Sequence, residues 1–440
     1  MRCAGSRGCP GRSRRGCRRG RAGRCRGGFR SHVPSSPARG EARPGEPCVI
    51  DRTVVRIANG RNAVSRGELF DPLYGADRVA SRLDDAAWVR ALLAVEVALS
   101  DAAAAHGVIP AEHARAISAA AAGLEVDPAE LGRAAVEGGN PVIPLVRMLR
   151  AASGEAGGSV HPGATSQDIV DTALVLLVRS ATEVVLDDLQ GAADAAAALA
   201  AAHRDTPMIA RTLGQQALPT TFGAVAAGWC AGLDRARRRL GEVASALPAQ
   251  LGGAAGTLAA LHPHGFAVAD DLADRLGLAP QGTPWHTERT RIGELATALG
   301  VAAGACAKPA TDVVLLSGTE LGEVSESAPG DSSSMPHKRN PIAAVTARAA
   351  ARRAPGLVAT LLAVMDHEHQ RAAGPWHAEW ETLAELLRSA GGAAARLRVS
   401  LAGLRVHPEA MAADLALTAA GTGAPHHAGA IVDRVLEGRS

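Results

Sequence analysis

Apolar residues recur at helical spacing along most of the chain from residue 84 onward. The pattern predicts a first helix from Asp84 to Leu99, a second after Pro110 and a short one ending at Ala152. Five long helices are then expected at residues 167–204, 220–247, 285–320, 341–365 and 376–402. No stretch alternates convincingly between apolar and polar residues, so no strand is predicted. Long helices with short connections are typical of an elongated helical bundle.

Composition favours the same all-α fold. Aromatic residues make up 2% of the chain and hydrophobic residues 47%, with alanine dominant among them. Strands draw on aromatic and β-branched residues, so a β-sandwich or barrel is disfavoured. We predict a disordered Arg/Gly/Pro-rich tail (residues 1–50), an N-terminal helical domain (51–155), a central long-helix bundle (156–405) and a short C-terminal helical segment (406–440).

Positive charge is concentrated in the tail. Residues 1–50 contain 13 arginines and two acidic residues, a balance of +11, so the remainder carries −8. This mildly acidic body gives no reason to expect nucleic acid as a partner. Only Cys230 and Cys306 lie outside the tail, which fits a reducing compartment, the cytoplasm. No apolar run reaches the ~18 residues that a membrane span needs, so no membrane partner is expected.

The most informative stretch runs from Pro329 to Pro341 and reads PGDSSSMPHKRNP. Asn340 suits a helix N-cap and Pro341 the first helical position, so the following helix is expected to point free N–H groups back at the stretch. Hydroxyls at Ser332 and Ser333, with the Lys338 cation, then make a site for carboxylates. A solvated serine-rich turn before a capped helix is the alternative that these residues leave open.

A second helix start is similar. In the sequence HPGATSQD at residues 161–168, Thr165 and Asp168 have the spacing of a capping box. Ser166, Gln167 and the backbone amides can hold an anion, and His161 stands just outside. The alternative is a capped helix beside a surface histidine. A third stretch, residues 211–223, offers neutral donors in Gln215 and its neighbour.

Together these stretches resemble the fumarase/aspartase superfamily, which includes argininosuccinate and adenylosuccinate lyases. Residues 331–341, here called the signature segment, resemble its motif G-S-S-x-M-P-x-K-x-N-P, with Asp331 where glycine is usual. Residues 161–168 resemble its first block and residues 211–223 its second, in the right order. The resemblance covers residues 65–435. It implies a homotetramer with a central bundle of long helices and active sites that each take blocks from three chains.

Within the superfamily, Leu213 occupies the place of a histidine that helps proton transfer in most relatives. The stretches around Asn140 and His161 and at residues 283–289 resemble bacterial 3-carboxy-cis,cis-muconate cycloisomerases, although Thr290 stands where aspartate is expected. This resemblance implies lactone closure of a tricarboxylate in protocatechuate breakdown through β-ketoadipate, without cofactor or metal. A carboxylate nucleophile is already ionised at neutral pH, so a missing histidine is tolerable.

The resemblance also implies roles for individual residues. Ser332 is the proton donor to carbon, and Lys338 and Asn340 stabilise carboxylate and enolate charge. His161 binds substrate or shares in proton transfer. The remaining expected substrate-binding residues are Thr165, Ser166 and Gln167 for a second carboxylate, Arg289 and Arg291 for a third, and Ser333, Gln215 and Asn140.

Two other functions stay open at this point. One is a lyase of the same superfamily, such as an adenylosuccinate lyase-like enzyme that releases fumarate, against which Leu213 argues. The other is a non-catalytic structural paralogue, against which the intact Ser332, Lys338 and Asn340 argue. A metal site is not expected at His367-Glu368-His369, because this spacing points the two histidines to different faces of a helix.

Overall fold

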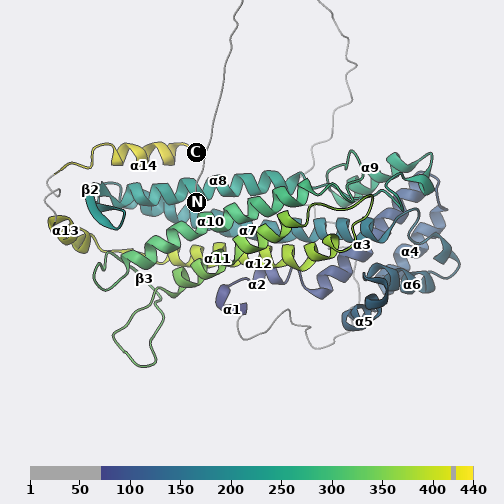
Figure 1. Cartoon of the computed structure of the whole chain (residues 1–440), viewed down its shortest axis with the longest axis horizontal. Coiled ribbons are helices and arrows are strands. Elements are labelled where there is room, and N and C mark those ends of the chain that lie inside the picture. The colour runs from purple at the N-terminus through teal and green to yellow at the C-terminus, as the bar shows by residue number, and fades with distance from the viewer. Residues whose placement is uncertain (1–70, 418–422, 440) are drawn as a thin grey trace, which may run out of the picture. The chain divides into compact units, whose positions relative to one another are not determined.

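The five predicted long helices form the centre of the molecule. The computed structural model describes residues 71–417 and 423–439, which belong to one compact unit, and the tail predicted at residues 1–50 lies outside the described residues. The long helices are α7 (Ser166–Ala202), α8 (Phe222–Ser245), α10 (Thr290–Leu316), α11 (Ile342–Ala363) and α12 (Pro375–Ala402). They pack side by side (Figure 1), as the all-α prediction requires.

Shorter helices gather where α7 begins. They are α3 (Asp85–Ala105), α4 (Ala111–Gly123), α5 (Pro128–Gly138), α6 (Val142–Ala152), the 3₁₀ helices at Gly154–Ser159 and Ala259–Leu261, and α9 (Gly265–Leu276). Helices α1 (Asp71–Tyr74) and α2 (Asp77–Ala80) lie further along the bundle, where Arg78 of α2 pairs with Asp187 and Asp188 of α7. The predicted helix start at Asp84 is confirmed, since its carboxylate accepts a hydrogen bond of 2.7 Å from the Ala87 N–H. Helix α3 packs against α7 and so joins this group to the bundle.

The prediction of no strands is wrong. Strands β1 (Pro207–Thr212) and β2 (Gln215–Thr221) form an antiparallel hairpin, and β3 (Val324–Glu326) pairs with β4 (Leu404–Val406). The hairpin turns through Leu213 and Gly214, whose φ angles of 51° and 76° fit the two-residue turns that suit strand twist. Only one end of the hairpin is buried, so its sequence does not alternate as a half-buried strand would.

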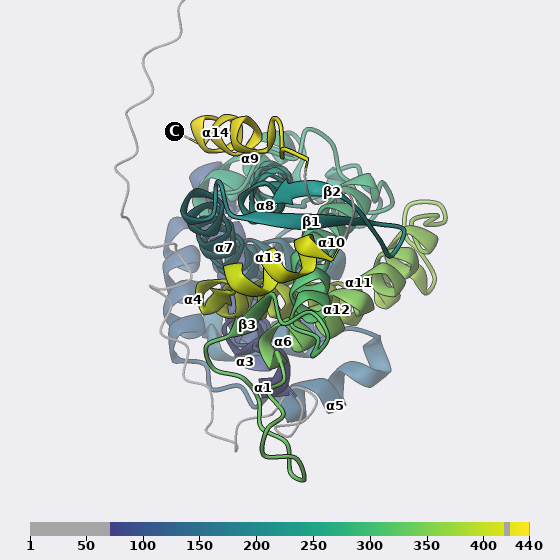
Figure 2. The ribbon, with the colours of Figure 1, turned by 90° about the vertical axis from the view of Figure 1, so that its left-hand side faces the viewer.

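The C-terminal segment contains α13 (Pro408–Ala416) and α14 (Ala428–Glu437). Helix α14 packs against α8, and the Arg204 guanidinium pairs with Asp433 at 2.6 Å. Helix α13 packs against β1. Figure 2 looks onto this end of the bundle, where the hairpin, α13 and β3 lie together.

Helix α7 runs from one end of the bundle to the other. Its 37 residues span about 55 Å at 1.5 Å per residue. It begins beside α3 and α6 and leads at its far end into β1 (Figure 1). Among the described helices, α10 is long and apolar enough to cross a membrane by length and composition, but here it packs against α8, α11 and α12.

Candidate active site

Asp168 organises the first block from inside the protein. Its buried carboxylate accepts hydrogen bonds from the backbone N–H groups of Thr165 (2.9 Å), Gly252 (2.8 Å) and Gly253 (3.0 Å). The His286 Nε2 atom lies 2.6 Å from the same carboxylate. The predicted capping box at the start of α7 is present. A Cβ on Gly252 would lie 2.7 Å from His286 Cε1, so this close approach needs glycine.

Gln167 differs from its expected role as a substrate ligand. Its side chain is 1% exposed, and its amide donates to the His286 carbonyl (2.9 Å) and to Asp171 (3.2 Å). Its amide oxygen accepts a hydrogen bond of 3.0 Å from Arg371. The amide is thus engaged by the protein on every side. Ser166, the first residue of α7, and Thr165 are half-buried and nearer the surface.

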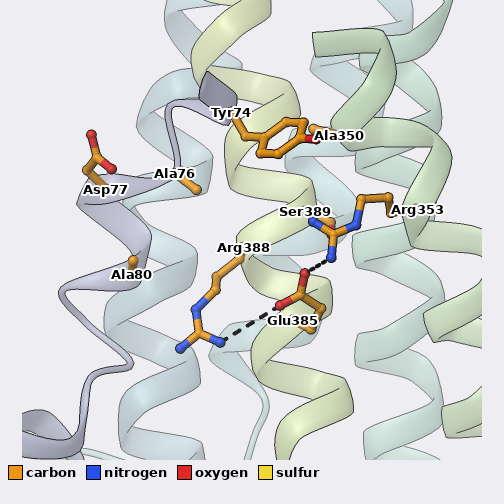
Figure 3. A pocket seen from close by; sticks show the side chains of 9 residues that line it. All are labelled: Tyr74, Ala76, Asp77, Ala80, Ala350, Arg353, Glu385, Arg388 and Ser389. Carbon is orange, nitrogen blue, oxygen red and sulfur yellow. Dashed lines mark hydrogen bonds and ion pairs between the residues drawn. The ribbon is translucent and has the colours of Figure 1, made fainter. Parts of the chain in front are cut away.

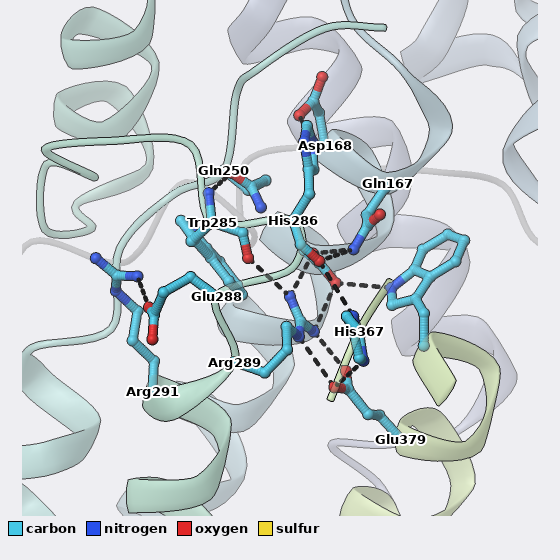
Figure 4. A network of polar contacts seen from close by, with 12 residues as sticks. Gln167, Asp168, Gln250, Trp285, His286, Glu288, Arg289, Arg291, His367 and Glu379 are labelled. Carbon is cyan, nitrogen blue, oxygen red and sulfur yellow. Dashed lines mark hydrogen bonds and ion pairs between the residues drawn. The ribbon is translucent and has the colours of Figure 1, made fainter. Parts of the chain in front are cut away.

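Arg289 likewise differs from its expected role at a substrate carboxylate. Its guanidinium forms a paired contact with Asp171 (2.8 and 3.2 Å), another with Glu379, and a longer one to the Trp285 carbonyl (3.5 Å). These contacts use all five of its N–H donors, and the residue is 1% exposed. Figure 4 shows this cluster, in which Arg289 binds protein carboxylates instead of a ligand.

Arg291 and Asn140 are also engaged locally. Arg291 points away from the Arg289 cluster (Figure 4) and donates to Glu288 at 2.7 Å. The Asn140 side chain is buried, donates to the Gly138 carbonyl (3.2 Å) and accepts from the Val142 N–H (3.1 Å). It therefore shapes the turn into α6.

Arg371 is a cation at this end that the sequence patterns do not reveal. It lies between α11 and α12 and donates to the Gly253 and Ala254 carbonyls (3.2 and 2.9 Å) besides Gln167. These three bonds leave two of its five N–H donors unassigned among the described residues. It brings positive charge to the first block from a segment about 200 residues away, a distance that local pattern reading does not span.

His161 carries a buried carboxylate partner, Glu96, that the sequence patterns also do not reveal. The His161 Nδ1 atom lies 2.7 Å from a Glu96 carboxylate oxygen, and Glu96 is fully buried in α3. Burial alone would lower the pKa of His161, but the hydrogen bond and charge of Glu96 and the charge of Asp168 outweigh burial and raise it. The one sequence feature that could have indicated this pair is the single glutamate inside the apolar run of α3.

The second block lies at the hairpin, at the other end of α7. Leu213 is fully exposed at its tip, and Gln215 follows as an exposed residue of β2. Arg211 on β1 pairs with Glu323 (2.8 Å) and Asp414 (3.0 Å), which ties the hairpin to the base of β3 and to α13. The hairpin is thus held close to its turn, because Arg211 pairs across the hairpin with Gln216, and only the tip itself projects into solvent.

The signature segment forms a loop closed at its base. Gly330 and Asn340 exchange two backbone hydrogen bonds, of 2.8 and 3.1 Å. The Ser332 hydroxyl oxygen accepts from the Met335 N–H at 3.2 Å, and Ser333 and Lys338 are exposed. In Figure 2 this loop extends below β3. The first block lies at one end of the bundle, and the hairpin and the signature segment lie at the other end. The first block therefore does not meet the other two segments within one chain.

The helix start after this loop corrects the expectation for Asn340. Helix α11 begins at Ile342, and Asn340 is not its N-cap. The buried Glu326 carboxylate accepts from the N–H groups of Ala343 (3.0 Å) and Ala344 (2.8 Å). A protein carboxylate therefore already occupies the N–H groups that the sequence offered to a substrate.

Two cavities differ in whether they have room for a substrate. One, of about 20 Å³, lies among Tyr74, Arg353, Glu385 and Arg388 (Figure 3), away from all three segments, and has room for about one water molecule. Another, of about 600 Å³, lies between the hairpin and helices α8 and α10 and includes Arg211. Among residues 71–417 and 423–439 no group of three or more His, Cys, Asp or Glu side chains has the arrangement of a metal site.

Comparison with known proteins matches the chain to a family described as lyase, over residues 68–356. A 3-carboxy-cis,cis-muconate cycloisomerase from Bradyrhizobium diazoefficiens is 45% identical, covering 80% of this chain and 79% of the relative. A nitrosuccinate lyase from Streptomyces davaonensis is 44% identical, covering 81% and 78%. The crystal structure of a 3-carboxy-cis,cis-muconate lactonizing enzyme from Pseudomonas putida is 38% identical, with a TM-score of 0.75 over 84% of this chain and 87% of that one.

Proposed function

Because the chain belongs to this lyase family, of the fumarase/aspartase type, we propose that it is a 3-carboxy-cis,cis-muconate cycloisomerase. It closes its substrate to 4-carboxymuconolactone in protocatechuate (β-ketoadipate) degradation. The observation that carries the proposal is the similarity to cycloisomerases along four-fifths of the chain. The family match includes the first block, the second block and the signature segment.

The reaction adds a substrate carboxylate across a carbon–carbon double bond and a proton to the neighbouring carbon. The carboxylate is ionised at neutral pH, so Leu213 in place of a histidine costs the reaction no base. Ser332 gives the proton to carbon. Its hydroxyl oxygen already accepts a bond of 3.2 Å from the Met335 N–H, and this donor stabilises the negative charge left on the oxygen until solvent returns a proton.

Positive charge for the tricarboxylate comes from both ends of the bundle. Lys338 is exposed and has no side-chain partner among the described residues, whereas its neighbour Arg339 pairs with Asp331 at 3.3 Å. Arg371 and His161 supply charge at the first block, where Thr165 and Ser166 offer hydroxyls. Arg371 takes the role that the sequence suggested for Arg289.

We further propose a homotetramer in which different subunits complete each site. The support is geometric, because the first block and the signature segment lie at opposite ends of α7, about 55 Å long by its residue count. Helices α10 and α11 also expose large apolar side chains that a partner would cover. These are Val301, Leu315, Ile342, Val345 and Leu362, between 41% and 59% exposed.

Mixing two inactive variants tests this assembly. His161→Asn and Ser332→Ala each remove one group of the proposed site, from opposite ends of the bundle. Co-refolded or co-expressed subunits should recover turnover that neither variant has alone, because some mixed sites then contain both wild-type residues. A monomer by light scattering, or mixtures that stay inactive despite forming hybrids, would refute shared sites.

The proposed compartment is the cytoplasm. The two cysteines of the body, Cys230 and Cys306, are free and buried. Burial raises the pKa of each thiol to about 12, so neither is a reactive thiolate at neutral pH. Both thiols therefore fit a reducing environment without a redox role.

The decisive experiment is an absorbance assay for loss of 3-carboxy-cis,cis-muconate with purified protein and no added metal. Turnover that disappears in Ser332→Ala establishes the cycloisomerase. Release of fumarate from adenylosuccinate, without loss of the muconate, would instead establish the lyase alternative. No turnover of any of these substrates by a folded tetramer would favour a non-catalytic paralogue.

A second candidate is elimination of nitrite from nitrosuccinate, favoured by a 44% identical nitrosuccinate lyase. Loss of nitrite removes a proton from one carbon and leaves fumarate. Nitrite, like a lactone carboxylate, departs as a weakly basic anion, so Leu213 suits this reaction as well. A colour assay for nitrite under the same conditions separates the two candidates. The substrate that is turned over with the larger kcat/KM identifies the main activity.

A further inference from the structure

Glu96 is the only charged side chain in the run from Leu92 to Leu99, in the interior of α3. It is fully buried, and one of its carboxylate oxygens lies 2.7 Å from His161 Nδ1. The other oxygen has no hydrogen-bond partner among the described residues. A buried carboxylate is costly unless it is paired, so His161 is the group that makes this glutamate tolerable.

His161 is placed for this contact by its backbone. Its φ of 63° lies in the left-handed region, which non-glycine residues adopt at a cost. The contact with Glu96 assigns the Nδ1 hydrogen, so Nε2 is the ring nitrogen left for a ligand. The side chain is 14% exposed, enough for one edge of the ring to meet a substrate at the first block.

We propose that Glu96 is a positioning residue that holds His161 as an imidazolium, with its Nε2–H directed at a carboxylate of the substrate. His161 then acts as a charged anchor for the substrate, and the proton for carbon comes from Ser332. This role for the pair rests on the proposed function, because a polycarboxylate substrate is what makes a second buried charge useful.

The charges around His161 agree with this assignment. Glu96 faces it from α3, and Asp168 from α7 adds negative charge, although Asp168 is itself bound to His286. Arg150 from α6 opposes them, and burial also disfavours the imidazolium. The net effect raises the pKa of His161, with Glu96 the largest favourable contribution. Anchoring is therefore present below this raised pKa and is lost as pH rises through it.

The test uses Glu96→Gln, which keeps an acceptor for the Nδ1–H and removes only the charge. NMR titration of histidines labelled at Cε1, with the His161 signal identified by its loss in His161→Asn, reports the pKa directly. We expect the pKa of His161 to fall in Glu96→Gln, because the charge that favours the imidazolium is gone. The matched control is Asp101→Asn, which removes a charge from the same helix near Arg275 and Asp271 and should leave His161 unchanged.

Kinetics give the second readout. KM for the tricarboxylate should rise about tenfold in Glu96→Gln near neutral pH and return toward the wild-type value as the pH falls below the pKa of His161 in the variant, because the imidazolium is then present in both proteins. A rise that is equal at all pH values would show a merely structural role and overturn the proposal. So would an unchanged His161 titration. If the wild type does not turn over the tricarboxylate, the proposed function fails, while the NMR titration still decides whether Glu96 holds the charge.

Discussion

At the end of the bundle where α7 begins, polar side chains are buried and bonded to one another, whereas those of the signature segment are exposed and loosely held. Asp168 accepts from three backbone N–H groups, and Arg289 uses every donor it has. Ser332 and Lys338 make few contacts beyond their own loop. The buried end is therefore rigid before substrate arrives, and the exposed end can rearrange around it. The contrast assigns stability mainly to one end and chemistry mainly to the other.

Ser332→Ala is the sharpest test of the exposed end. Removing the proton donor should lower kcat by ~10²–10⁴-fold, because general acid catalysis is typically worth that much. The thermal midpoint should hardly move, since the hydroxyl accepts only from two N–H groups of its own exposed loop, those of Ser334 (3.5 Å) and Met335 (3.2 Å). Ser333→Ala is the matched control and should retain turnover. If the two results are exchanged, the acid is Ser333 and the register of the loop is shifted by one residue.

Arg289→Met is the corresponding test of the buried end. It leaves Asp171 and Glu379 as buried carboxylates without their shared cation, a kind of change that costs about 3–5 kcal/mol. Thermal and denaturant unfolding should show this loss. Adding Asp171→Asn and Glu379→Gln to the Arg289→Met variant should recover part of the lost stability, because the unpaired buried charges are then removed. A single variant as stable as wild type would show that the cluster is dispensable.

Lys338→Met should weaken binding and turnover together. Hydrogen bonds to charged groups contribute about 1.5–3 kcal/mol, so kcat/KM should fall roughly 10- to 100-fold. The chain has only two lysines, Lys308 and Lys338, and its other Lys/Arg positions are arginines. Lys308→Met is thus the natural control, because Lys308 pairs with Asp312 on α10. Equal losses in the two variants would remove Lys338 from the site.

Glu326→Gln probes the buried base of the exposed end, where β3 meets the start of α11. The variant keeps one acceptor for the first N–H groups of α11 and loses the charge that favours a helix N-terminus, an effect of about 1 kcal/mol. The melting temperature should drop by a few degrees, as unfolding scans at fixed protein concentration will measure. A large loss of turnover with unchanged stability would mean that Glu326 acts on the loop and not on the helix.

Asp331→Gly should have the smallest effect. It restores the glycine usual in the signature and breaks an exposed ion pair with Arg339, and such pairs contribute ~0–1 kcal/mol. Steady-state kinetics should change less than about twofold. A large change in either direction would show that the exposed end is more ordered than its contacts indicate.

The long helices were predictable because each one repeats its apolar positions over many turns. Residues 167–204 and 376–402 match α7 and α12 within two residues. The hairpin was missed because the turn uses Leu213 before Gly214, where asparagine or aspartate would have been a signal. The strand pair β3–β4 joins segments about 80 residues apart, which no local pattern reveals.

The site was harder to predict because partners decide what a charge does. Arg289 resembles a ligand-binding arginine until Asp171 and Glu379, 118 and 90 residues away, are seen beside it. Glu96 looks like a flaw in an apolar helix until His161 is seen at 2.7 Å. Asn340 has the residue type and the sequence position of an N-cap. The first N–H groups of α11 are instead bound by the carboxylate of Glu326, which lies on β3.

The exposed tip of the hairpin has a consequence for how new activities arise. Leu213 is fully exposed among the described residues, so its replacement is limited mainly by a φ of 51°, which histidine and asparagine tolerate better than most residues. Mutations at the hairpin tip should therefore change the stability of the fold little, while the buried ion pairs at the other end of the bundle stabilise it. Evolution can therefore exchange one leaving group for another through a few solvent-facing positions, and a laboratory library restricted to the hairpin tip and the signature segment should yield folded enzymes with altered substrate preference.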